Sequence, residues 1–134
     1  MANYLLDTNI LSAVMRGEPR SLLNRMATMA PSRLHLSCIV LAELSAGAEM
    51  GTRKAATLAA LADMTAEMTV LPFDAGSARA YASVRAALQR KGKVIGPMDM
   101  LIAAQALSAG LVLVTDNLRE FKRVPGLTCE NWMH

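Results

Sequence analysis

The stretch LVLVTDN, residues 111–117, decides the fold class of this chain of 134 residues. Its first four residues form an apolar run with β-branched valines, which is typical of a strand covered by helices on both faces. Gly110 precedes the run and ends a helical pattern, and the polar residues Thr115, Asp116 and Asn117 follow it. The stretch therefore predicts a short buried strand, entered from a helix, with polar side chains at its carboxyl end.

Short apolar strands and helical patterns alternate through the rest of the chain. Strands are expected at residues 4–6, 34–38, 70–73, 111–114 and 127–129. Helices are expected around residues 10–14, 22–29, 39–50, 54–68, 75–91 and 98–109, most of them bounded by glycine or proline. This alternation predicts a three-layer α/β/α sandwich with a central parallel sheet. We expect residues 1–134 to form one domain.

Composition excludes several classes of protein. Hydrophobic residues make up 53% of the chain, which is too apolar for a disordered protein. No apolar run approaches the roughly 18 residues that a membrane-spanning helix needs. The N-terminus lacks a basic stretch ahead of an apolar one, so no export signal is expected. We therefore expect a soluble cytoplasmic protein with no membrane partner, in which Cys38 and Cys129 are reduced core residues.

Positive charge is in modest excess, with a formal net charge of +3 that attracts polyanions without identifying one. The basic residues gather in two segments, which hold Arg85, Arg90, Lys91 and Lys93, and then Arg119, Lys122 and Arg123. Taken alone, these charges are better explained as two solvated surfaces, because exposed Lys and Arg are common. If nucleic acid binds, phosphate contacts should dominate, because aromatic residues (4%) are too few to form a base-stacking platform.

Four acidic residues occupy positions that do not suit solvated charges. Asp7 directly follows the first expected strand and Asp116 follows a later one, so both should lie at the carboxyl edge of the sheet, where ligands bind in open α/β folds. Glu43 lies on or beside the inward face of its helix, and Asp99 lies in the first turn of an apolar helix. Taken singly, Asp7 and Asp99 are explained equally well as helix-capping acids, and Asp116 as a turn residue.

Convergence of these acids would require either raised pKa values or a bound cation. Two carboxylates 4 Å apart repel by about 4 kcal/mol at an effective dielectric near 20. Oxygen ligands without His or Cys favour Mg²⁺ or Mn²⁺ over Zn²⁺, and neither His35 nor His134 stands in a zinc-ligand spacing. Such a site suits phosphate chemistry, in which the ion neutralises the phosphate and lowers the pKa of the attacking water.

Four segments resemble the PIN-domain ribonucleases, specifically the VapC-type toxins of bacterial toxin–antitoxin pairs. They are LLDTNIL (5–11), IVLAELSAGA (39–48), GPMDMLIAA (96–104) and LVTDNLREFKRVPGLTCENW (113–132), in the family's order over essentially the whole chain. The resemblance implies that Asp7, Glu43 and Asp99 are catalytic residues around a Mg²⁺ ion, for which Mn²⁺ can substitute. Asp7 and Asp99 would be its direct ligands.

The fourth acidic position departs from the family's common pattern. That position holds Asn117 here, whereas Asp116 precedes it, and either side chain is a candidate for the metal. The resemblance also implies that the Thr115 hydroxyl supports a metal-binding carboxylate and that Asn9 steadies the loop bearing Asp7.

The resemblance further implies hydrolysis of a phosphodiester bond in structured RNA, with tRNA as the expected substrate. The ending RVPGLTCENW resembles a subgroup for which the anticodon loop of initiator tRNA is the expected target. A homodimer and a VapB-type antitoxin are the implied partners. The side chains expected to contact RNA are Arg85, Arg90, Lys91, Lys93 and Arg119.

Other α/β families fit the residues less well. A haloacid-dehalogenase-like phosphatase needs a second Asp two residues after the first, and this chain has Asn9 there. A phosphoprotein receiver domain needs a Lys after a late strand, and residues 111–117 contain none. A non-catalytic RNA-binding or regulatory module with the same fold remains the alternative, because Asn117 occupies the fourth acidic position.

Overall fold

One five-stranded sheet forms the centre of the computed structural model, which describes all residues from Met1 to His134. Its strand order is β3-β2-β1-β4-β5, and every neighbouring pair is parallel. The strands are β1 (Tyr4–Leu6), β2 (Leu34–Ser37), β3 (Thr69–Leu71), β4 (Val112–Val114) and β5 (Cys129–Glu130). Because β1 lies in the middle, the loop after it opens at the centre of the carboxyl edge of the sheet.

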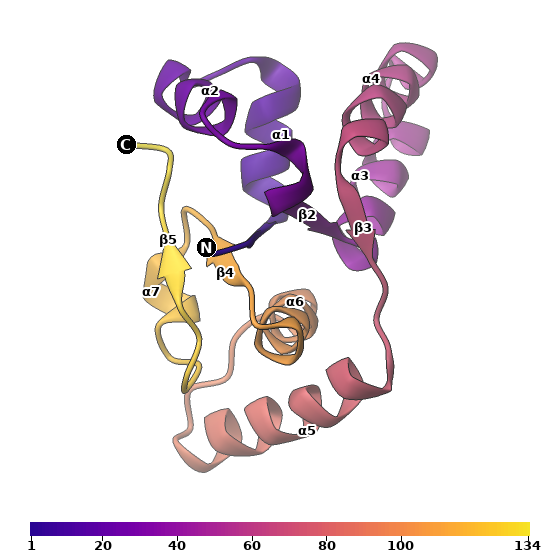
Figure 1. The fold of residues 1–134 in the computed structure, drawn as a ribbon. Helices are drawn as coiled ribbons and strands as arrows, with labels where there is room; N and C mark the ends of the chain where they lie inside the picture. Colours follow the sequence, from indigo (N-terminus) through magenta and orange to yellow (C-terminus); the bar gives the residue numbers. More distant parts are fainter.

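Helices cover both faces of this sheet. They are α1 (Thr8–Arg16), α2 (Arg20–Ala27), α3 (Cys38–Met50), α4 (Lys54–Glu67), α5 (Ala75–Arg90), α6 (Pro97–Ala109) and α7 (Leu118–Phe121), with a 3₁₀ turn η1 (Pro31–Arg33). The α1–α2 and α3–α4 pairs lie on one side of the sheet, and α5 packs with α6 on the other (Figure 1). The predicted three-layer α/β/α sandwich with a central parallel sheet is confirmed.

The core is built around the two central strands. Leu5, Leu6, Leu113 and Val114 are fully buried, as the continuous apolar run of the later strand predicts. Burial of each such side chain contributes about 1.5–3 kcal/mol to the free energy of unfolding. No helix in the structure has both the length and the apolar character needed to cross a membrane.

Several element boundaries differ from the predictions by one or two residues. The strand expected at 34–38 ends at Ser37, because the Ser37 hydroxyl accepts a hydrogen bond from the Ile39 amide (2.9 Å) and caps α3. The helix expected at 22–29 ends at Ala27, and the strands expected at 70–73 and 127–129 are shifted to 69–71 and 129–130. The elements η1 and α7 were not predicted, because three or four residues are too few to show a helical period.

Neither cysteine is fully buried as a core residue was expected to be, although Cys129 packs against the core. Cys38 and Cys129 are free and only half-buried. Cys38 is the first residue of α3 rather than the end of a strand, and Cys129 lies in the edge strand β5. Burial raises the pKa of the Cys129 thiol, and the nearby Lys122 opposes that effect.

Candidate active site

Asp7 is buried at the carboxyl end of β1 and caps α1. Its Oδ1 accepts a hydrogen bond from the Ile10 amide (3.1 Å), and its Oδ2 accepts one from the Thr115 hydroxyl. Burial raises the pKa of Asp7 to about 6 against the opposing effect of these two hydrogen bonds, and the negative charges of Asp116 and Asp99 raise it further. A cap alone would not require this surrounding charge, so the structure places Asp7 in an acidic site.

Asp99 and Glu43 reach the same site from two different helices. Asp99 lies in the first turn of α6, where burial and the negative charges of Glu120 and Glu43 raise its pKa. Glu43 lies on α3, and its Oε1 accepts a hydrogen bond from the Thr8 hydroxyl (2.9 Å) at the start of α1. Asp7 and Asp99 are 92 positions apart in the chain, and yet the charge of Asp99 raises the pKa of Asp7.

The loop after β4 supplies the polar residues predicted at the fourth position. Asp116 is exposed, and its Oδ1 accepts a hydrogen bond from the Asn9 side-chain amide (3.3 Å). Thr115 is fully buried; its hydroxyl donates to Asp7 and accepts from the Asn117 backbone amide (3.0 Å). The two side chains that the sequence left as alternatives, Asp116 and Asn117, therefore have different partners.

Glu120 lies among these carboxylates, although no pattern in the sequence predicted it. It lies in α7, its Oε2 accepts a hydrogen bond from the Asn117 side-chain amide (3.0 Å), and its charge is the largest electrostatic influence on the pKa of Asp99. The signal in the sequence is the spacing Asn117-x-x-Glu120, which places both side chains on one face of a helical turn. That spacing carries no information until α7 is known to be helical.

The site has five carboxylates that influence one another, namely Asp7, Glu43, Asp99, Asp116 and Glu120. No three or more His, Cys, Asp or Glu side chains are grouped so that they could hold a metal ion by themselves. Mg²⁺ does not need such a cage, because it usually keeps several waters and binds through one or two carboxylates together with substrate phosphates. The donor set, which contains only oxygen and has excess negative charge, therefore fits a hard divalent cation.

The two basic segments meet in space next to this site. An open depression of about 280 Å³ is lined only by Lys91, Lys93, Arg119, Lys122 and Arg123. The Arg123 guanidinium donates a hydrogen bond to the Val94 carbonyl oxygen (3.3 Å) and so joins the segments. Arg85 and Arg90, which were also predicted to contact RNA, are exposed on α5 and do not line the depression.

Comparison with known proteins gives the same family over nearly the whole chain. The model of the PIN domain family matches residues 4–127. Ribonuclease VapC2 of Haemophilus influenzae is 39% identical over 99% of this chain and 100% of its own length. The tRNA(fMet)-specific endonuclease VapC of Salmonella typhimurium is 39% identical over 98% of this chain and 99% of its own length.

Solved structures agree with the sequence comparison. In the crystal structure of DNA-bound VapBC from Salmonella typhimurium, one chain superimposes on this structure with a TM-score of 0.93 and 39% identity, over 98% of this chain and 99% of that one. The family model, the sequence identity to these relatives and the structural superposition all indicate the same family. The chain belongs to the PIN-domain family, among its VapC ribonucleases.

Proposed function

We propose that this chain is the toxin of a toxin–antitoxin pair and hydrolyses a phosphodiester bond of tRNA at the carboxyl edge of its sheet. The observation that carries the proposal is the group of carboxylates around Asp7, where burial and mutual repulsion raise the pKa of Asp7 and of Asp99. Acids that destabilise one another's charged forms favour the uptake of a cation.

PIN-domain ribonucleases generally depend on a divalent metal ion, and we assign Mg²⁺ to this site with Mn²⁺ as a substitute. Asp7 and Asp99 would hold the ion, and Glu43 with Glu120 would complete its negative surroundings. Asp116 and Asn117 remain candidates for the fourth position. When bound, the cation neutralises charge on the phosphate and makes a bound water more acidic.

The other residues of the site orient the carboxylates. The Thr115 hydroxyl and the Ile10 amide hold the two oxygens of Asp7, so that its carboxylate keeps one orientation. Asn9 holds Asp116, and Thr8 holds Glu43. These donors are neutral, so they orient the acids without neutralising the charge that a cation needs.

The substrate and the partner follow from the relatives. The relative from Salmonella typhimurium that carries the name tRNA(fMet)-specific endonuclease supports initiator tRNA as the substrate, cut in its anticodon loop. The VapBC structures support a VapB-type antitoxin as the partner. We also assign a homodimeric state and a cytoplasmic location, both of which stay predictions.

Incubation of the purified chain, freed of antitoxin, with total bacterial tRNA tests the function. We expect cleavage in Mg²⁺ or Mn²⁺ that stops on addition of EDTA. The Asp7→Asn variant keeps an N-cap acceptor for α1 but loses the charge, so it should fold and lose at least about 100-fold in rate. A folded Asp7→Asn variant with the wild-type rate would remove Asp7 from the mechanism. RNA binding without metal-dependent cleavage would favour the non-catalytic alternative.

A further inference from the structure

The depression beside the active site contains only cations. Lys91, Lys93, Arg119, Lys122 and Arg123 line it, and no acidic, aromatic or apolar side chain contributes to its wall. None of the five takes part in an ion pair, since the two ion pairs of the structure are Arg25–Glu130 and Lys54–Glu49. Uncompensated like charges repel one another, so this surface favours a ligand with several negative charges.

The backbone that carries these cations is ordered by hydrogen bonds at both segments. Lys91 caps the end of α5, and Gly92, with φ +65°, turns the chain so that the Lys93 amide donates to the Leu88 carbonyl oxygen (3.0 Å). On the other segment, the Arg123 amide donates to the Glu120 carbonyl oxygen (3.0 Å). The positions of the cationic side chains therefore start from ordered turns, which reduces the entropy lost on binding.

The side chains that line the depression favour phosphate groups over nucleobases as ligands. A site for single-stranded bases normally offers aromatic rings for stacking, and none lines this depression. Lys and Arg side chains without such rings contact phosphate oxygens, which position a nucleic acid without reading its sequence. The observations therefore favour the sugar–phosphate backbone as the ligand.

The helix α7 joins this depression to the active site. Arg119 lines the depression, while the next residue, Glu120, faces Asp99 in the acidic site. Because Arg119 and Glu120 are consecutive residues of this short helix, α7 contributes one side chain to the depression and one to the acidic site. We infer that the depression binds backbone phosphates that flank the bond to be cut, and so offsets the repulsion between RNA and the acidic site. The identity of the ligand as RNA rests on the proposed function.

Salt dependence of tRNA binding tests this inference. Binding of total bacterial tRNA is measured in EDTA, where no cleavage occurs, for the wild type and for the Lys91→Gln/Lys93→Gln variant. Each lost phosphate contact should reduce the magnitude of the slope of log K against log[salt] by about 0.7–0.9. The slope of the double variant should therefore be smaller in magnitude by roughly 1.5. Arg119→Gln/Lys122→Gln, on the other segment, should lose a similar amount.

Arg20→Gln/Arg53→Gln is the matched control, because it removes the same charge from two exposed positions that lie outside the depression and carry no predicted RNA contact. Its slope should change less than that of either test pair. An equal change in the control, or an unchanged slope in both test pairs, would overturn the inference. Displacement of tRNA by a polyglutamate peptide of equal charge at equal concentration would also overturn it, since the surface would then fit an acidic protein partner.

The test also separates this inference from the proposed function. If the wild type binds tRNA through the depression but never cleaves it in Mg²⁺, the nuclease proposal fails and the phosphate site stands. If the wild type cleaves tRNA while both test pairs bind with the wild-type salt slope, the phosphate site fails and the nuclease proposal stands. Unfolding curves check that each variant folds, and the single variants Lys93→Gln and Lys122→Gln replace any pair that does not.

Discussion

Four of the five carboxylates at the candidate active site accept a hydrogen bond from a neutral side chain. The pairs are Asp7 with Thr115, Glu43 with Thr8, Asp116 with Asn9, and Glu120 with Asn117. Asp99 is the carboxylate for which the structure records no such bond. Neutral donors fix the direction of a carboxylate while its negative charge is kept, which suits a group that binds a cation.

The Thr115→Val substitution tests this orientation. Valine has nearly the shape of threonine but cannot donate to Asp7 or accept from the Asn117 amide, so we expect a loss of about 10–100-fold in kcat/KM on tRNA. Thr115→Ser, which keeps the hydroxyl, should restore most of the rate. Thr128→Val, at an exposed position, is the control and should behave as the wild type. A folded Thr115→Val variant with full activity would show that the hydroxyl does not position Asp7.

The raised pKa of Asp7 makes stability depend on pH in the metal-free protein. The pKa is about 6 in the folded state and 3.8 in the unfolded state, so burial penalises the charged form only when the chain is folded. The resulting stability is fully present below pH 3.8 and is lost as the pH rises through 6, by about 3 kcal/mol.

Urea unfolding in EDTA from pH 4 to pH 7.5 measures this effect as the difference between the wild type and Asp7→Asn. The variant does not titrate at this position, so the difference should grow in its favour with rising pH. A constant difference across this range would mean that Asp7 has an ordinary pKa in the folded chain.

At the scale of elements, a buried amide joins three parts of the fold. Gln105 on α6 is fully buried; its Oε1 accepts from the Ser37 hydroxyl at the β2–α3 junction, and its amide donates to the Leu71 carbonyl oxygen in β3 (3.1 Å). The helices that carry Asp99 and Glu43 are thereby connected through one side chain. Such a network has a definite geometry, because an unsatisfied polar group in the core is unfavourable.

Gln105→Leu should therefore destabilise the fold by about 1–3 kcal/mol, because it leaves the Ser37 hydroxyl and the Leu71 carbonyl without this partner. Gln89→Leu, on the exposed side of α5, is the control and should change the stability by less than about 0.5 kcal/mol. Urea unfolding at constant pH compares the two. Equal effects would show that the buried network contributes nothing to stability.

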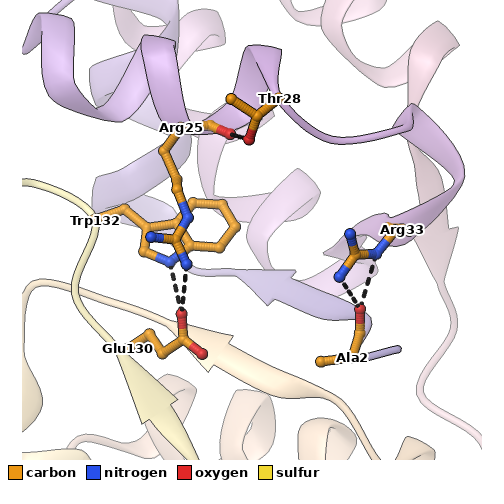
Figure 2. Close-up of polar contacts among 6 residues, drawn as sticks. All are labelled: Ala2, Arg25, Thr28, Arg33, Glu130 and Trp132. Atoms are coloured by element: carbon orange, nitrogen blue, oxygen red, sulfur yellow. Dashed lines mark hydrogen bonds and ion pairs between the residues drawn. The ribbon is translucent and has the colours of Figure 1, made fainter.

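At the scale of the molecule, the two ends of the chain are fastened to the same part of the fold. The Trp132 ring packs edge-on to the Tyr4 ring, with the two ring centroids 4.8 Å apart. The Arg25 guanidinium lies 5.2 Å from the centroid of the Trp132 ring, and the Trp132 Nε1 donates a hydrogen bond to Glu130 (2.9 Å). Figure 2 shows Arg25 and Trp132 with Glu130, and it also shows Arg33, which donates two hydrogen bonds to the Ala2 carbonyl oxygen. The C-terminal segment therefore packs against the core through Trp132.

Trp132→Ala should lower the free energy of unfolding by about 3–5 kcal/mol, because it empties a buried aromatic site. Trp132→Phe keeps a ring against Tyr4 and should lose less. Thermal and urea unfolding measure both variants, and tRNA cleavage well below the melting temperature should be unchanged. Wild-type stability of Trp132→Ala would show that the C-terminal segment is not part of the folding unit.

The order of elements was predictable because periodicity and caps are local signals. The alternation of strands and helices, and with it the parallel sheet, is confirmed, whereas α7 and η1 were missed because they are shorter than one clear period. The positions of Asp7 and Asp116 after strands predicted that both would lie at one edge of the sheet. Their roles, like those of Glu43 and Asp99, stay predictions for the experiments above.

Sequence alone determined the fold class and the family, since each depends on residues near one another in the chain or on a family pattern. It also predicted Asp7, Glu43, Asp99 and Asp116 as site residues, whose roles stay predictions. Only the tertiary structure decided that Glu120 joins them and that two separate basic segments form one surface. The physical reason is that charges interact through space. Helix α7 places the charge of Glu120 where it acts on Asp99, and it places Arg119 on the wall of the depression that Lys93 also lines, although no local pattern connects these segments.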